Sequence, residues 1–187
     1  RRGHVPQLTE LDYANLAATG TTLVRVTLTL VRCEGCNMYS MPPEDVSYAD
    51  TAVAMGAKYG FHVVIAMEPL PGGKYQEFWS SPALKQSIVS NWATIAQRFR
   101  GNSVVAGYDI INEPVSPGSD QSMRQGDWTT FAISLISGVR IVDPDHAIIV
   151  EFAPWAKPQG YQQLSPLPFR NLVYSVHFYE PVNLTHQ

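Results

Sequence analysis

The sequence is poor in features that define several common classes of protein. Its 187 residues contain only two cysteines, and no apolar run approaches the roughly 18 residues needed to cross a bilayer. Lysine and arginine form no cluster of the kind that follows a phosphate backbone, and the formal net charge is −3. These absences argue against a membrane protein and against nucleic acid as a partner.

The two cysteines form one Cys-x-x-Cys motif, at Cys33 and Cys36. A structural zinc site needs four ligands, and no second cysteine pair exists, so no metal site is expected. The pair follows a strand-like segment and enters a loop, unlike a thioredoxin-type motif at the start of a helix. We expect a local disulfide or free thiols.

The composition is that of an ordinary globular protein, with 45% hydrophobic and 11% aromatic residues. No linker-like or low-complexity stretch interrupts it, so a single domain over residues 1–187 is expected. Helical segments alternate with strand-like segments, which predicts an α/β fold with a parallel sheet. The predicted strands begin near Leu23, His62, Val104, Ala147 and Leu172.

The predicted helices have recognisable ends. A helix over residues 8–19 begins with a capping box formed by Thr9 and Asp12, and a second helix over residues 45–59 ends at Gly60. Ser81-Pro82 starts a third, in which apolar residues recur at helical spacing. A fourth contains Trp128.

Polar and aromatic side chains follow the strands at the points where the strands end. These residues are Glu68, Asn112, Glu113, Glu151, Trp155, His177 and Tyr179. The carboxyl ends of barrel strands are where α/β barrels place their chemistry. Arg25, inside the first strand, needs a carboxylate partner if it is buried. Trp155 is suited either to stacking on the apolar face of a sugar or to covering the core.

Several motifs together resemble glycoside hydrolase family 5, the cellulase-like retaining enzymes of clan A. The motifs are Gly20-x-x-Leu23-Val24-Arg25, Asn91-Trp92-x-x-Ile95-Ala96, Gly107-Tyr108-Asp109-Ile110-Ile111-Asn112-Glu113-Pro114 and His177-Phe178-Tyr179. The resemblance implies a partial (reduced) TIM barrel, with about five parallel strands and outer helices. It also implies hydrolysis of β-linked glucans or gluco-oligosaccharides without a cofactor, and it favours an extracellular location.

The resemblance further implies roles for individual residues. Glu113 is expected to be the general acid/base, while Asn112, His177 and Tyr179 contact the sugar or orient the nucleophile. Arg25 is expected to support the catalytic carboxylates. One departure is Glu68, which stands where the family usually has a substrate-contacting histidine.

The second catalytic carboxylate is the main open point. The family's nucleophile ends a seventh strand, and residues 1–187 are expected to cover about strands two to six, without it. Glu68 and Glu151 end strands beside that of Glu113, about 4.8 Å apart. Retaining glycosidases need carboxyls about 5–5.5 Å apart and inverting ones about 6.5–9.5 Å. Either residue is therefore a candidate partner, or it is merely solvated or paired with Arg25.

Two readings of function follow, a glycoside hydrolase and a non-catalytic carbohydrate-binding or structural half-barrel. Both leave the outer strands, those beginning at Leu23 and Leu172, without partners. Three ways of covering these strands are expected. They pair with a second copy of the chain in a homo-oligomer, with each other in a tightened barrel, or with a rearranged terminal segment.

Overall fold

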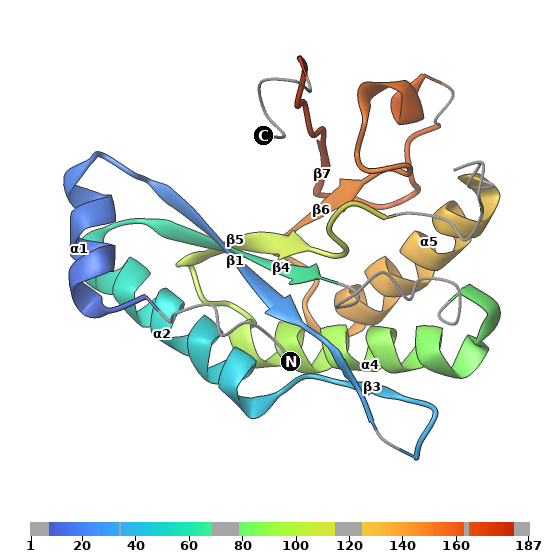
Figure 1. Ribbon diagram of the computed structural model, residues 1–187, viewed down its shortest axis with the longest axis horizontal. Coiled ribbons are helices and arrows are strands. Elements are labelled where there is room, and N and C mark those ends of the chain that lie inside the picture. The colour runs from blue at the N-terminus through green and yellow to red at the C-terminus, as the bar shows by residue number, and fades with distance from the viewer. Residues whose placement is uncertain (1–7, 34, 69–78, 115–124, 163–164, 182–187) are drawn as a thin grey trace.

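The computed structural model describes residues 8–33, 35–68, 79–114, 125–162 and 165–181. Five strands form one sheet in the order β1-β4-β5-β6-β7 (Figure 1). They are β1 (Leu23–Thr29), β4 (His62–Glu68), β5 (Val105–Asp109), β6 (Ala147–Glu151) and β7 (Leu172–Ser175). Every neighbouring pair is parallel, so the predicted α/β partial barrel is confirmed.

Helices connect the strands and cover the sheet. They are α1 (Glu10–Ala18), α2 (Pro43–Tyr59), α4 (Pro82–Phe99), α5 (Gln125–Val142) and the short 3-10 helix η1 (Pro158–Tyr161). Figure 1 shows α2 and α4 running along the same side of the sheet. None of the helices within the described ranges is both long and apolar enough to span a membrane.

The helix ends match the sequence signals. Thr9 and Asp12 form both hydrogen bonds of the predicted capping box before α1. Gly60 ends α2 in the left-handed conformation, with φ 80°, which glycine adopts without steric cost. The Ser81 hydroxyl caps α4 by accepting from the Leu84 N–H. Trp92 and Trp128 are buried, as expected for packing residues.

Two strands are shorter than their apolar runs predict. The run over residues 23–31 predicts a strand that ends at Val31, but β1 ends at Thr29 and Val31 begins a separate short strand. The run over residues 104–112 predicts a strand that ends at Asn112, but β5 ends at Asp109, so the segment Asn112-Glu113-Pro114 follows the strand. Backbone bonding still continues past β5, because the Asn112 N–H donates to the Met67 carbonyl over 3.0 Å.

The centre of the sheet is tightly packed. β4 is buried from Val63 to Met67, as expected for a parallel strand covered on both faces. On β5, a Cβ added at Gly107 would lie 2.6 Å from the Ala147 carbonyl oxygen. Glycine at this position therefore allows β5 and β6 to approach closely.

A buried polar network lies near the amino end of β6. Asp143 is fully buried and accepts from the Tyr108 hydroxyl over 2.8 Å, and its Oδ2 lies 2.5 Å from His146 Nδ1. The backbone N–H groups of Asp145 and His146 also donate to Asp143. Burial opposes ionisation, but the bonds from His146 and Tyr108 outweigh it and lower the pKa of Asp143.

We expect this network to make stability depend on pH below about 4. A carboxyl group whose pKa is lower in the folded state stabilises that state above its unfolded pKa, and the contribution is lost as pH falls through the folded value. Asp143→Asn should lower the free energy of unfolding by about 1–3 kcal/mol at pH 6. In urea titrations, the difference in the free energy of unfolding between wild type and variant should be smaller at pH 3 than at pH 6. A difference in stability that does not change with pH would contradict this prediction.

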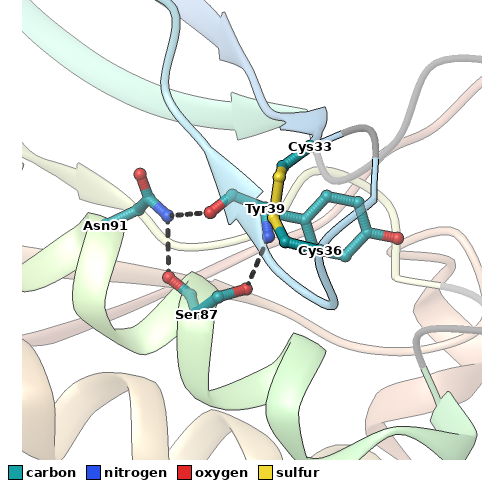
Figure 2. The surroundings of a disulfide bond; sticks show 5 residues. All are labelled: Cys33, Cys36, Tyr39, Ser87 and Asn91. Atoms are coloured by element: carbon teal, nitrogen blue, oxygen red, sulfur yellow. Dashed lines mark hydrogen bonds between the residues drawn. A yellow bond between two sulfur atoms is a disulfide. The ribbon is translucent and has the colours of Figure 1, made fainter.

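The cysteine motif closes a small hairpin after β1. β2 (Val31–Arg32) and β3 (Tyr39–Ser40) are antiparallel, and Cys33 and Cys36 form a disulfide between them. Figure 2 shows Tyr39 bound to α4: its N–H donates to the Ser87 hydroxyl over 2.9 Å, and its carbonyl accepts from Asn91 Nδ2 over 3.0 Å. The disulfide thus closes the end of a hairpin already anchored on α4.

We expect the disulfide to stabilise the protein only modestly. It closes a loop of four residues, for which the chain-entropy relation gives about 2 kcal/mol. Cys33→Ser/Cys36→Ser should lower the free energy of unfolding by that amount or less in urea titrations. The effect should be small because Ser87 and Asn91 still bind Tyr39 in the variant. A loss of stability well above about 4 kcal/mol would show that these two hydrogen bonds do not hold the hairpin in place without the disulfide.

The outer strands are at opposite edges of the sheet. β1 and β7 do not pair, so the expectation of a tightened, closed barrel is wrong for the described residues. Leu23 on β1 and Val173 on β7 are 53% and 48% exposed. Apolar side chains therefore remain uncovered at both edges.

Candidate active site

The carboxyl end of the sheet gathers charged groups from four strands. Arg25 on β1 donates to Asp109 at the end of β5 through Nε, over 2.9 Å, and Nη2, over 2.7 Å. Asp109 is almost fully buried, whereas the Arg25 side chain is 36% exposed. Arg25 Nη2 also lies 3.4 Å from Glu151 Oε1. Arg25 therefore has the carboxylate partner expected from the sequence, and that partner is mainly Asp109.

Asn112 is held from both ends of its amide. Its Oδ1 accepts from Arg25 Nη2 over 3.0 Å, and its Nδ2 donates to Glu68 Oε2 over 2.9 Å. These two contacts assign the amide orientation, because a guanidinium only donates and an ionised carboxylate only accepts. Asn112 thus links Arg25 on β1 to the end of β4.

Glu113 occupies an uncommon backbone conformation. Its φ is 45°, in the left-handed region that few residues other than glycine adopt. Its N–H donates to Glu151 Oε2 over 2.6 Å, while its side chain is 28% exposed. Strained backbone of this kind concentrates at functional sites. The turn directs the backbone N–H to a buried carboxyl group and leaves the Glu113 carboxyl accessible.

His177 lies between two glutamates. Its Nδ1 is 2.6 Å from Glu113 Oε1, and its Nε2 is 3.0 Å from Glu151 Oε1. The contact between Nδ1 and Glu113 is a hydrogen bond, so a proton lies between these two atoms, on the imidazole nitrogen or on the carboxyl oxygen. The arrangement can keep a proton beside the accessible Glu113 carboxyl.

Glu151 is fully buried. Its pKa is raised to about 7, chiefly by burial and next by the Asp109 charge, while the Glu113 N–H and His177 oppose the rise. In this structure its carboxyl contacts Arg25, His177 and the Glu113 backbone, and has no exposed surface for a sugar. Glu151 therefore contacts only protein groups here, and its direct part in the chemistry stays a prediction.

Glu68, at the end of β4, is half-buried. Burial raises its pKa, the bond from Asn112 opposes that shift, and the Glu113 charge adds to it. Unlike Glu151, it keeps an exposed part at the face where Glu113 lies.

The two aromatic candidates flank this face. Tyr179 is 48% exposed, and its ring stands edge-on to His177 with centroids 6.0 Å apart. Trp155 is partly exposed, and its N–H donates to the Pro114 carbonyl over 3.2 Å, next to Glu113. The Lys157 ammonium lies 4.9 Å from the centre of the Trp155 ring.

The sequence reasoning missed Asp109 as a site residue. Asp109 lies within an apolar, strand-like run. A buried carboxylate there needs a cationic partner as much as a buried Arg25 needs an anionic one. It also missed Tyr161, whose hydroxyl accepts from the Phe152 N–H and donates to the Ser175 carbonyl, linking the ends of β6 and β7. No group of three side chains suited to a metal ion occurs among the described residues.

Known proteins share both the sequence pattern and the fold. The chain matches the cellulase family, glycosyl hydrolase family 5, over residues 5–187. It is 25% identical to Endoglucanase C of Acetivibrio thermocellus over 186 residues, which are 96% of this chain and 52% of that protein. It is 23% identical to a beta-xylosidase of Phanerodontia chrysosporium over 183 residues, covering 91% of this chain and 37% of that protein.

Among solved structures, endoglucanase Cel5A of Thermotoga maritima superposes with a TM-score of 0.77 at 21% identity. The superposition covers 96% of this chain and 56% of that one. The chain therefore has the fold of part of such a barrel, and it spans about half the length of the endoglucanases that it matches.

Proposed function

This chain belongs to the cellulase family, glycosyl hydrolase family 5, and on that premise we propose that it hydrolyses β-linked glucans or gluco-oligosaccharides with Glu113 as general acid/base. The observation that carries the proposal is the position of Glu113. Its carboxyl is accessible at the strand ends, and His177 Nδ1 contacts it over 2.6 Å.

In the proposed reaction, Glu113 gives a proton to the glycosidic oxygen as the bond to the sugar breaks. The departing sugar then leaves as an alcohol. Glu113, now ionised, accepts a proton from a water molecule whose oxygen bonds to the anomeric carbon, which completes hydrolysis; in a retaining mechanism a nucleophilic carboxylate would hold that carbon between the two steps. His177 stabilises the ionised form, since it can donate to the same carboxylate oxygen.

We propose that Glu151 is a positioning residue. It accepts the Glu113 N–H, and through His177 it also reaches the Glu113 side chain. Both contacts favour the left-handed turn that exposes the Glu113 carboxyl. Glu68 is a half-buried carboxyl on the neighbouring strand. The family resemblance implies that the nucleophile ends a seventh strand.

The proposed sugar contacts are Asn112, His177, Tyr179 and Trp155. Asn112 has one amide hydrogen beyond the one given to Glu68, and that hydrogen is available to a sugar hydroxyl. The Trp155 ring offers an apolar surface that suits the C–H face of a pyranose.

Hydrolysis of cello-oligosaccharides by purified protein tests the proposal, with Glu113→Gln as the comparison. We expect the wild type to release sugar and the variant to be slower. Equal residual rates would favour the alternative, a non-catalytic carbohydrate-binding or structural half-barrel.

We also propose that a second copy of the chain covers the outer strands in solution. Leu23, Val173 and Val176 are about half exposed at the β1 and β7 edges, where unpaired backbone groups are also available. Sedimentation velocity at micromolar concentration should show a dimer or larger species. A single monomeric species would refute this.

A further inference from the structure

The four carboxyl groups at the strand ends differ in their partners. Asp109 is paired with Arg25. Glu113 and Glu151 both contact His177, and Glu151 also contacts Arg25. Glu68 differs from the other three, because it forms no ion pair with any cationic side chain in the described part of the chain and its one hydrogen bond comes from the neutral amide of Asn112.

That single bond engages only one of the two carboxylate oxygens of Glu68. Asn112 donates to Oε2, and no described residue hydrogen-bonds to Oε1. The side chain is half-buried, so water solvates its charge only in part. Burial raises its pKa and the Glu113 charge adds to the rise, while the Asn112 bond and the Arg25 charge oppose it without cancelling it, so the ionised form is only partly compensated. A cation placed at Oε1 would supply that compensation.

Glu68 is also placed where a substrate would lie. It is bonded to Asn112, the residue directly before Glu113, so a sugar positioned for proton transfer from Glu113 lies within reach of both. A neutral sugar offers Glu68 a hydroxyl, whereas an amino sugar offers an ammonium group of nearly the same size. The hydroxyl bond to an ionised carboxylate is already charge-assisted, but an ammonium group adds the attraction between two opposite charges, which is stronger in partly buried surroundings.

We propose that Glu68 makes this site selective for β-linked amino sugars, whose protonated amino group binds the free carboxylate oxygen of Glu68. The inference rests on the proposed glycosidase site and specifies the substrate class that it prefers. It assigns Glu68 to specificity rather than to the displacement chemistry.

The test is equilibrium binding measured by calorimetry at low ionic strength. The ligands are the β-1,4-linked tetramers of glucosamine, of glucose and of N-acetylglucosamine. We expect the glucosamine tetramer to bind about tenfold more tightly than the glucose tetramer. The N-acetylglucosamine tetramer should lose the advantage, because its amide nitrogen carries no charge. Added salt should reduce the preference.

Glu68→Gln is the informative variant. Its amide oxygen can still accept from Asn112, so Asn112 stays in place while the negative charge is removed. We expect the variant to lose most of the tenfold preference, because its affinity for the glucosamine tetramer should fall much more than its affinity for the glucose tetramer. Asp145→Asn is the matched control, because it removes one exposed carboxylate before β6, at the amino end of the sheet. This control should retain the preference.

Equal binding of the glucosamine and glucose tetramers would overturn the inference, as would a preference that survives Glu68→Gln. Tight binding of the N-acetylated tetramer would also overturn it, because recognition would then depend on shape rather than charge. The proposed function fails separately: selective binding of the amino sugar without hydrolysis of any substrate would sustain the inference about Glu68 and refute the catalytic proposal.

Discussion

Glu113→Gln should reduce the rate of cello-oligosaccharide hydrolysis by a factor of about 10²–10⁴, the usual contribution of a general acid/base. Gln has almost the same shape as Glu and can still contact His177, but it cannot transfer a proton. The measurement is kcat/KM on cellotetraose for wild type and variant. Circular dichroism should show unchanged folding.

The leaving group supplies a second readout. An aryl β-glucoside with a strongly acidic phenol needs little protonation to depart, so formation of the free phenol should be much less affected by Glu113→Gln. The loss on cellotetraose should therefore greatly exceed the loss on the activated substrate. Equal losses on both would mean that Glu113 does not act as the proton donor, whatever else it does in the site.

Arg25→Leu should lower the free energy of unfolding by about 3 kcal/mol, the lower end of the range for breaking a buried ion pair from one side. The substitution leaves Asp109 buried without its cation and removes a contact from Glu151. The lower end applies because the Arg25 side chain is 36% exposed, so that water partly screens the pair. Urea titration at pH 7 measures the change.

Arg98→Leu is the control for this prediction. Arg98 makes a similar bidentate contact with Asp50, but both side chains are largely exposed, at 50% and 38%. Exposed pairs contribute about 0–1 kcal/mol, so this variant should be nearly as stable as wild type. If the two variants lost the same stability, the burial of Asp109 would not be the source of the effect.

Much of the fold follows from local patterns in the sequence. Capping signals at Thr9 and Ser81 and the stop at Gly60 mark helix ends, because each satisfies or terminates backbone bonding within a few residues. Apolar runs predicted all five strands of the main sheet. The ends of the strands were less certain, because bonding to a neighbour, rather than composition, decides where a strand stops.

The sequence by itself determined which residues stand at the strand ends, and through the segment Asn112-Glu113-Pro114 it pointed to Glu113. Only the tertiary structure decided their partners. Arg25 and Asp109 are 84 positions apart, and Glu113 and His177 are 64 apart, so no local pattern connects them. The same is true of burial: Glu68 and Glu151 both end strands, yet packing encloses Glu151 fully and Glu68 only in part. On that difference we base the proposals that Glu151 positions Glu113 and that Glu68 contacts a substrate, since a carboxyl group can bind a sugar only where the fold exposes it.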